Sequence, residues 1–123
     1  MDWQTNTNIL VQGFHTPLAQ YYVPRMVDYG TQIIGGVSPG RGGETSHELP
    51  VFDLVSEAVQ TVGEIHTSLI FVNAFEVLDA ALEAIAAGIS QLIIISAGVP
   101  PLDMVRLFCK AKKDQILILG PGS

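Results

Sequence analysis

The sequence predicts an α/β fold built on a doubly wound, parallel sheet of about five strands. Short runs rich in Val, Ile and Leu alternate with longer amphipathic segments, and strands joined through helices form right-handed parallel units. Hydrophobic residues make up 48% of the 123 residues and charged residues only 15%. This balance is typical of a sheet that helices cover on both faces. We therefore expect a single domain over residues 1–123.

The first half of the chain predicts three strands and two helices. The strands are expected at residues 9–12, 31–34 and 50–52, and the helices at 16–29 and 53–62. Gly30 should end the first helix, whereas Pro24 should kink or break it. A loop rich in Gly and Ser is expected at residues 35–48, and Asp53 is a suitable N-cap for the second helix.

The second half repeats this alternation. Strands are expected at residues 68–72, 91–95 and 115–119. Asn73 should open a helix through Ala87, with Glu76 as its capping-box partner. A last helix should begin at Pro100-Pro101, because proline is tolerated in the first turn.

Composition excludes several classes of function. The formal net charge of −6 argues against a nucleic-acid or anionic-membrane surface, which would need a basic patch. With Cys109 as the one cysteine and no metal-ligand spacing, neither an intramolecular disulfide nor a metal site is expected. No signal peptide is expected from residues 1–6, and the longest apolar run, residues 92–95, is far too short to span a membrane. We expect a cytoplasmic protein.

The loops after the strands are where a ligand should bind, because ligands of this fold lie outside the carboxyl ends of the strands. Those loops are residues 13–18, 35–43, 72–75 and 96–100. A nicotinamide cofactor is disfavoured. The first loop is not G-x-G-x-x-G, and Gly35-Gly36 occupy the place where an acidic residue would hold the ribose.

Residues 37–43 form the most specific local motif. Glycines flank Arg41 on both sides, so the backbone could approach a ligand while the guanidinium reaches a phosphate. The alternative is an exposed loop with a solvated Arg41, and the spacing alone favours neither. His15 likewise has two interpretations, a contact to a phosphate or an exposed loop histidine, whereas His47 and His66 are expected to be structural or solvated.

A set of short blocks runs in order along nearly the whole chain. The blocks are residues 11–14, 29–31, 35–43, 49–52, 70–72, 82–89, 98–100 with 102–105, and 119–121. In this order and spacing they resemble the α subunit of the succinate–CoA ligase family. The resemblance implies a Rossmann-like, coenzyme A-binding domain.

The same resemblance implies the ligand and its contacts. Coenzyme A, an acyl-CoA or a related adenine nucleotide is expected, with loop amides, helix N-termini and Arg41 holding the phosphates. The contacts carried over are Gly13, Phe14, His15, Thr16, Pro17, Leu18, Pro39, Gly40, Arg41, Val72, Asn73, Ala74, Ile95, Ser96 and Ala97. The chain departs from the family in three of these loops, and residues 72–75 read V-N-A-F where the family has V-P-A-P. Of the three glycines in its G-F-T-G-x-x-G loop only Gly13 remains, and Ala97 replaces a carboxylate.

Catalysis by this chain alone is not expected, and no catalytic residue is assigned. In the family a following domain carries the phosphorylated histidine, and a β subunit carries the ATP-grasp fold. The leading hypothesis is a stand-alone module that binds CoA without reaction. The alternatives are a regulatory or assembly protein that lost its ligand, the CoA-binding piece of a split ligase, and a domain cut from a longer chain. A homo-oligomer or a ligase-type partner subunit is compatible with each.

Overall fold

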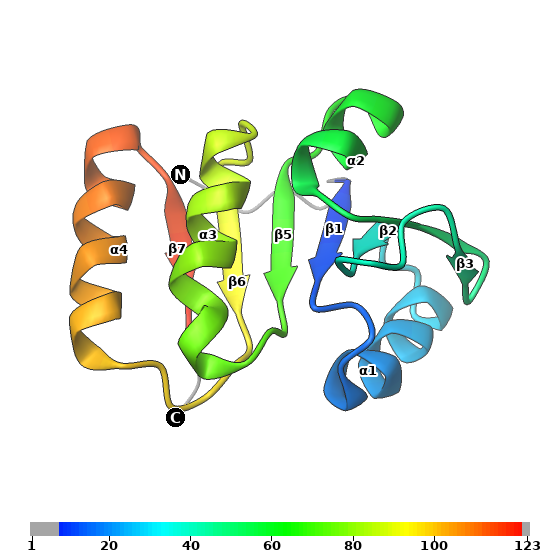
Figure 1. Ribbon diagram of the computed structural model, residues 1–123, viewed down its shortest axis with the longest axis horizontal. Coiled ribbons are helices and arrows are strands. Elements are labelled where there is room, and N and C mark those ends of the chain that lie inside the picture. Colours follow the sequence, from blue (N-terminus) through cyan, green and yellow to red (C-terminus); the bar gives the residue numbers. More distant parts are fainter. Residues whose placement is uncertain (1–7, 122–123) are drawn as a thin grey trace.

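The computed structural model describes residues 8–121 and contains a seven-stranded sheet (Figure 1). The strand order is β3-β4-β2-β1-β5-β6-β7, and every neighbouring pair is parallel except β3 and β4. The strands are β1 Ile9–Gln12, β2 Ile33–Val37, β3 Thr45–Ser46, β4 Leu49–Phe52, β5 Thr67–Ile70, β6 Gln91–Ile94 and β7 Leu117–Leu119. Apart from β3, the chain runs outward from β1 on one side and then outward from β5 on the other. The predicted doubly wound fold is therefore confirmed, with more strands than expected.

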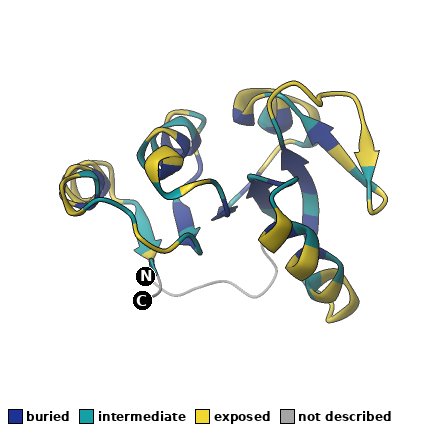
Figure 2. Cartoon of the chain, turned by 60° about the horizontal axis from the view of Figure 1, so that its bottom comes forward, coloured by how far each residue is buried: buried dark blue, intermediate teal, exposed yellow. Residues whose placement is uncertain are grey.

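The helices divide unequally between the two faces of the sheet. They are α1 Pro17–Asp28, α2 Val55–Val62, α3 Val77–Ala86 and α4 Pro101–Asp114, with a 3-10 turn, η1, at Ala74–Glu76. Figure 2 shows α1 on one face and the other three on the opposite face. Successive residues of β1 serve both sides, because Leu10 packs with the α2–α4 layer and Val11 with α1. Among residues 8–121, no helix is long and apolar enough to cross a membrane.

Helix α1 runs unbroken through Pro24, so the expected break is wrong. Both ends of the helix are well capped. The Thr16 hydroxyl accepts a hydrogen bond from the Ala19 amide, and the amides of Gly30 and Thr31 close the last turn at 3.0 and 2.9 Å. Fully buried Val23 holds the middle of the helix on the sheet. These contacts offset the one backbone hydrogen bond that proline removes.

Strand β2 begins at Ile33 and ends at Val37, so both limits are later than predicted. The end is later because Gly35 and Gly36 belong to the strand and not to the loop. A Cβ on Gly36 would lie 2.2 Å from the ring of Phe14, and one on Gly35 would lie 3.0 Å from the Pro50 carbonyl oxygen. Phe14 is fully buried. The glycines therefore make room for core groups from distant parts of the chain. Ser38, not a carboxylate, follows the strand.

The segment predicted as a loop at residues 35–48 also contains β3, which pairs with β4 as a hairpin. Asp53 is not the N-cap of α2. Its Oδ1 accepts hydrogen bonds from the amides of Gly40 and Gly42 at 2.7 and 2.9 Å. The N-terminus of α2 uses other carboxylates, since Leu54 donates to Glu57 Oε1 and Val55 donates to Glu83 Oε2.

Two boundaries in the second half also differ from prediction. Asn73 caps the short turn η1 and accepts a hydrogen bond from the Phe75 amide at 3.0 Å. The predicted capping box with the Glu76 carboxylate is absent from the side-chain hydrogen bonds of the described residues. Near the end of the chain, Gln115 adopts a left-handed conformation with φ 59° and ends α4. Strand β7 therefore begins only at Leu117.

Candidate functional site

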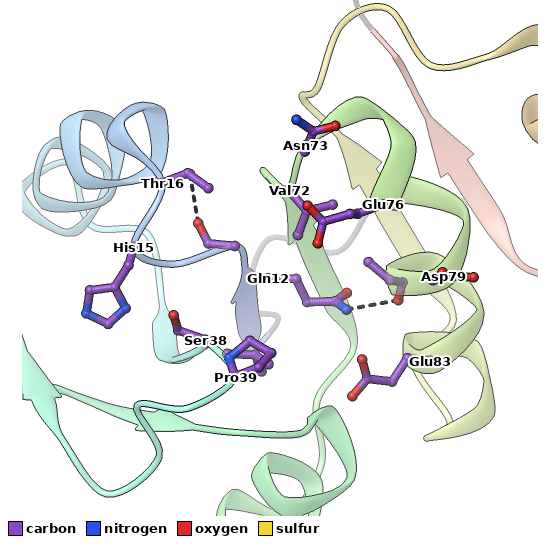
Figure 3. Close-up of a pocket in the computed structure, with 13 residues that line it drawn as sticks. Gln12, His15, Thr16, Ser38, Pro39, Val72, Asn73, Glu76, Asp79 and Glu83 are labelled. Carbon is purple, nitrogen blue, oxygen red and sulfur yellow. Dashed lines mark hydrogen bonds between the residues drawn. The ribbon is translucent and has the colours of Figure 1, made fainter.

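A cavity of about 420 Å³ lies at the carboxyl ends of β1, β2 and β5 (Figure 3). Strands β1 and β5 are neighbours whose following connections leave in opposite directions, which makes this the topological switch point. The lining residues come from the loops after these three strands and from α3. They are Gln12, Gly13, His15, Thr16, Val37, Ser38, Pro39, Val72, Asn73, Glu76, Asp79, Ala80 and Glu83.

The structure brings together only part of the set that the sequence predicted. The predicted residues that line the cavity are Gly13, His15, Thr16, Pro39, Val72 and Asn73. Phe14 is buried beneath the turn against Gly36. Gly40 and Arg41 lie on the exposed loop beside the cavity, and the remaining predicted residues, Pro17, Leu18, Ala74, Ile95, Ser96 and Ala97, are outside its lining.

Two of the predicted residues outside this lining contribute to a different groove. Leu18 and Ile95 line an apolar groove of about 450 Å³ between α1 and the strands β5 and β6. Its remaining lining is Tyr22, Met26, Leu69, Phe71 and Ile93. Ser96 instead donates its hydroxyl to the Val72 carbonyl and ties the loop after β6 to the segment after β5.

Sequence reasoning missed the wall of the cavity that the end of η1 and the helix α3 provide. Glu76, Asp79 and Glu83 are three and four positions apart, which places them on one side of a helix. A helix that begins just beyond a carboxyl end directs its first turns at the switch point, so this spacing was a usable signal. Gln12 gave no such signal. Its buried amide donates to the Ala80 carbonyl at 2.9 Å and accepts from the Ser68 hydroxyl at 2.6 Å.

The turn between β1 and α1 has a shape that requires Gly13. Its φ is +79°, and a Cβ there would lie 2.7 Å from the Val72 amide nitrogen. The amides of Gly13 and Phe14 both donate to the Val37 carbonyl at 3.2 Å, and Thr16 donates to the Gly13 carbonyl at 3.1 Å. Most amides of this turn are therefore already used within the protein.

The backbone amides of the loop from Ser38 to Glu44 are also hydrogen-bonded within the protein. Ser38 donates to the Phe52 carbonyl, Arg41 to Ser38 and Gly43 to Val51, at 2.9 to 3.0 Å. The amides of Gly40 and Gly42 donate to the Asp53 carboxylate, and the Glu44 amide donates to the Arg41 carbonyl. Every amide hydrogen of the loop is therefore donated to an acceptor within the protein. The expectation that loop amides hold phosphates stays a prediction, and these amides would have to share or exchange their present acceptors to meet it.

Cationic and titratable side chains gather at the α1 end of the cavity. Burial, and then the positive charge of Arg41, lower the pKa of His15, while Glu44 opposes this shift and His47 adds to it. Arg41 itself forms a half-exposed ion pair with Glu44 at 3.7 Å. Phe14 packs edge-on against the His15 ring with centroids 5.4 Å apart. This end offers a positive charge and a neutral imidazole.

The α3 end carries the opposite charge. Figure 3 shows Glu76, Asp79 and Glu83 across the cavity from His15. Glu83 is engaged by the Val55 amide at 2.9 Å. Carboxylates repel phosphate but accept hydrogen bonds from hydroxyl and amino groups. The cavity is therefore polarised, with one end for an anion and the other for hydrogen-bond donors. Within residues 8–121, no three His, Cys, Asp or Glu side chains form a cluster that could hold a metal ion.

Comparison with known proteins identifies a family. Residues 4–98 match the model of the CoA binding domain. The α subunit 1 of an ADP-forming succinate–CoA ligase from Archaeoglobus fulgidus is 37% identical over 117 residues, which are 95% of this chain and 40% of that protein. The chain thus spans well under half the length of this relative. The resemblance drawn from the sequence blocks is confirmed.

Solved structures agree with the fold. ATP citrate lyase from Methanothrix soehngenii, in complex with citrate and coenzyme A, has a TM-score of 0.82 at 21% identity. The likeness covers 95% of this chain and 21% of that one. A conserved hypothetical protein from Pyrococcus furiosus has a TM-score of 0.72 at 16% identity, and here 94% of this chain covers 95% of the other. The same fold is therefore found within a long chain and as nearly all of a short one.

Proposed function

The chain belongs to the CoA binding domain family, and we propose that it binds coenzyme A or an acyl-CoA in the switch-point cavity without catalysing a reaction by itself. The observation that carries the proposal is the polarised cavity at the switch point. Its volume of about 420 Å³ suits one part of so large a ligand, with the rest outside.

The charges favour one orientation of the ligand. The phosphates belong at the end with His15, Thr16 and Arg41, because Glu76 and Asp79 would repel them at the other end. The α3 carboxylates would then face groups that donate hydrogen bonds, such as ribose hydroxyls or an amino group. Val37, Val72 and Ala80 supply apolar lining between the two ends.

Arg41→Ala tests this orientation. It should weaken CoA binding by roughly tenfold, since a hydrogen-bonded charge is worth on the order of 1.5 kcal/mol. Arg106→Ala on α4 removes an exposed Arg outside the cavity lining and should leave the affinity unchanged. Calorimetry with CoA, an acyl-CoA, ADP, ATP and NAD would measure both variants. No binding of any of these at millimolar concentration would sink the proposal.

A second candidate is a regulatory or assembly protein that kept the fold and lost the ligand. Two observations favour it: the loop amides are already used, and three carboxylates line the cavity. A partner protein that co-purifies, together with a melting temperature that no ligand raises, would support this candidate. A partner that restores acyl-CoA formation would instead indicate a split ligase.

A further inference from the structure

His15 is the one titratable side chain at the α1 end of the cavity lining, and its surroundings disfavour a charge on it. Its Nδ1 atom is buried and has no hydrogen-bond partner within residues 8–121. A protonated ring would therefore carry a donor that nothing in this part of the protein accepts. Burial and Arg41 lower the pKa of His15, so the ring is neutral near pH 7 when no ligand is present.

The groups that face His15 act on its protonation in opposite directions. Phe14 contacts the ring without offering a charge. Arg41 and His47 disfavour protonation, and Glu44 favours it. Arg41 is drawn to Glu44 at 3.7 Å, and His47 Nε2 lies 2.9 Å from Gln20 Oε1. Across the cavity lie Glu76, at the end of η1, and Asp79, in the first turn of α3. A phosphate placed beside the ring would add the negative charge that this end lacks.

We propose that His15 takes up a proton when a phosphate of CoA binds, so that the affinity of this site rises as the pH falls. The proton comes from the solvent, with no more than one taken up per ligand bound. This inference rests on the proposed function. It goes beyond that function by making His15, which stands where the G-F-T-G-x-x-G loop of the family has its threonine, a proton-linked ligand contact.

The sign follows from linkage. The ligand's negative charge raises the pKa of His15 in the complex above its value in the empty protein. Between these two values the complex holds more protons, so lowering the pH tightens binding until the empty protein is protonated as well. A rise of about one pKa unit on binding corresponds to a roughly tenfold gain in affinity across that window.

Calorimetry of the full chain tests this inference, over about pH 5.5 to 8, where histidine titrates, in buffers with different heats of ionisation. Dephospho-CoA is the better probe. The 3′-phosphate monoester of CoA itself titrates near pH 6, whereas the diphosphate of dephospho-CoA does not titrate in this range. We expect proton uptake with both ligands. In His15→Gln the uptake of dephospho-CoA binding should vanish. In His66→Gln, whose imidazole lies beside Asn8 and Glu64, it should persist.

The outcomes separate the inference from the proposed function. Tight binding of dephospho-CoA with no proton uptake, or with uptake that survives in His15→Gln, would overturn the inference and leave the function standing. No binding of either ligand would overturn both. If His15→Gln does not fold, an NMR titration of the wild-type His15 ring with and without dephospho-CoA decides the matter. The ring must titrate at higher pH in the complex.

Discussion

The two loops that border the α1 end of the cavity are held in place by different forces. The turn after β1 rests on the core, since Phe14 is fully buried and Gly13 leaves no room for a side chain beside Val72. The loop after β2 is exposed, and its glycines 40 and 43 have no atom within 4 Å of an added Cβ. One carboxylate, Asp53, anchors this second loop. Substitutions in the first region should therefore damage the fold, and those in the second should mainly change ligand binding.

Gly36→Ala should have the largest effect, because it acts on the first region. The new methyl group would lie 2.2 Å from the buried Phe14 ring, and overpacking of this kind costs about 3 kcal/mol. Urea unfolding would measure the loss. Gly40→Ala is the matched control in the second loop. It meets open space at φ +89° and should cost only about 1 kcal/mol of backbone strain. Equal losses in the two variants would contradict the comparison.

The same contact shows where prediction from the sequence ends. The order of the four helices and of all strands but β3 was predictable, because the apolar runs and the helix-ending glycines are local signals. The limits of β2 were not, since Gly36 looks like a loop residue until Phe14 is known to pack on it. Asp53 was assigned to a helix N-terminus for the same reason. The sequence does not show that the Asp53 carboxylate binds the Gly40 and Gly42 amides and not those of the α2 N-terminus.

The residues of the candidate site also include some that local sequence signals predict and some that only the fold reveals. Residues within three positions of a strand's carboxyl end, such as Gly13, Val72 and Asn73, could be placed at the cavity from topology alone. The acidic wall of α3 also had a spacing signal that sequence reasoning did not use. The internal hydrogen bonds of the loop amides could not be foreseen in full, because those to Val37, Val51 and Phe52 join a loop to a strand whose register only the fold determines.

Asp53→Ala should have an intermediate effect. It removes the acceptor of two amide hydrogen bonds, at a cost to stability of about 1–2 kcal/mol for a part-exposed carboxylate. The loop that carries Arg41 would lose its anchor, so CoA affinity should fall by about as much as in Arg41→Ala. Calorimetry and urea unfolding on one preparation give both values. Glu48→Gln removes a charge that makes no hydrogen bond or ion pair among the described residues and is the control. Unchanged CoA affinity in Asp53→Ala would show that the anchor does not position Arg41.

Glu44→Gln should have the smallest effect on stability. The ion pair with Arg41 is 3.7 Å long and half-exposed on both sides, so its loss should change the free energy of unfolding by less than about 0.5 kcal/mol. CoA binding should tighten by about twofold at low salt and not at high salt, because a negative charge beside the phosphate end has been removed. Glu44 also raises the pKa of His15, so the pH range of tightening should move lower in the variant. Calorimetry across pH at two salt concentrations measures both effects. Weaker binding at low salt would mean that Glu44 orients Arg41 for the ligand and does not compete with it.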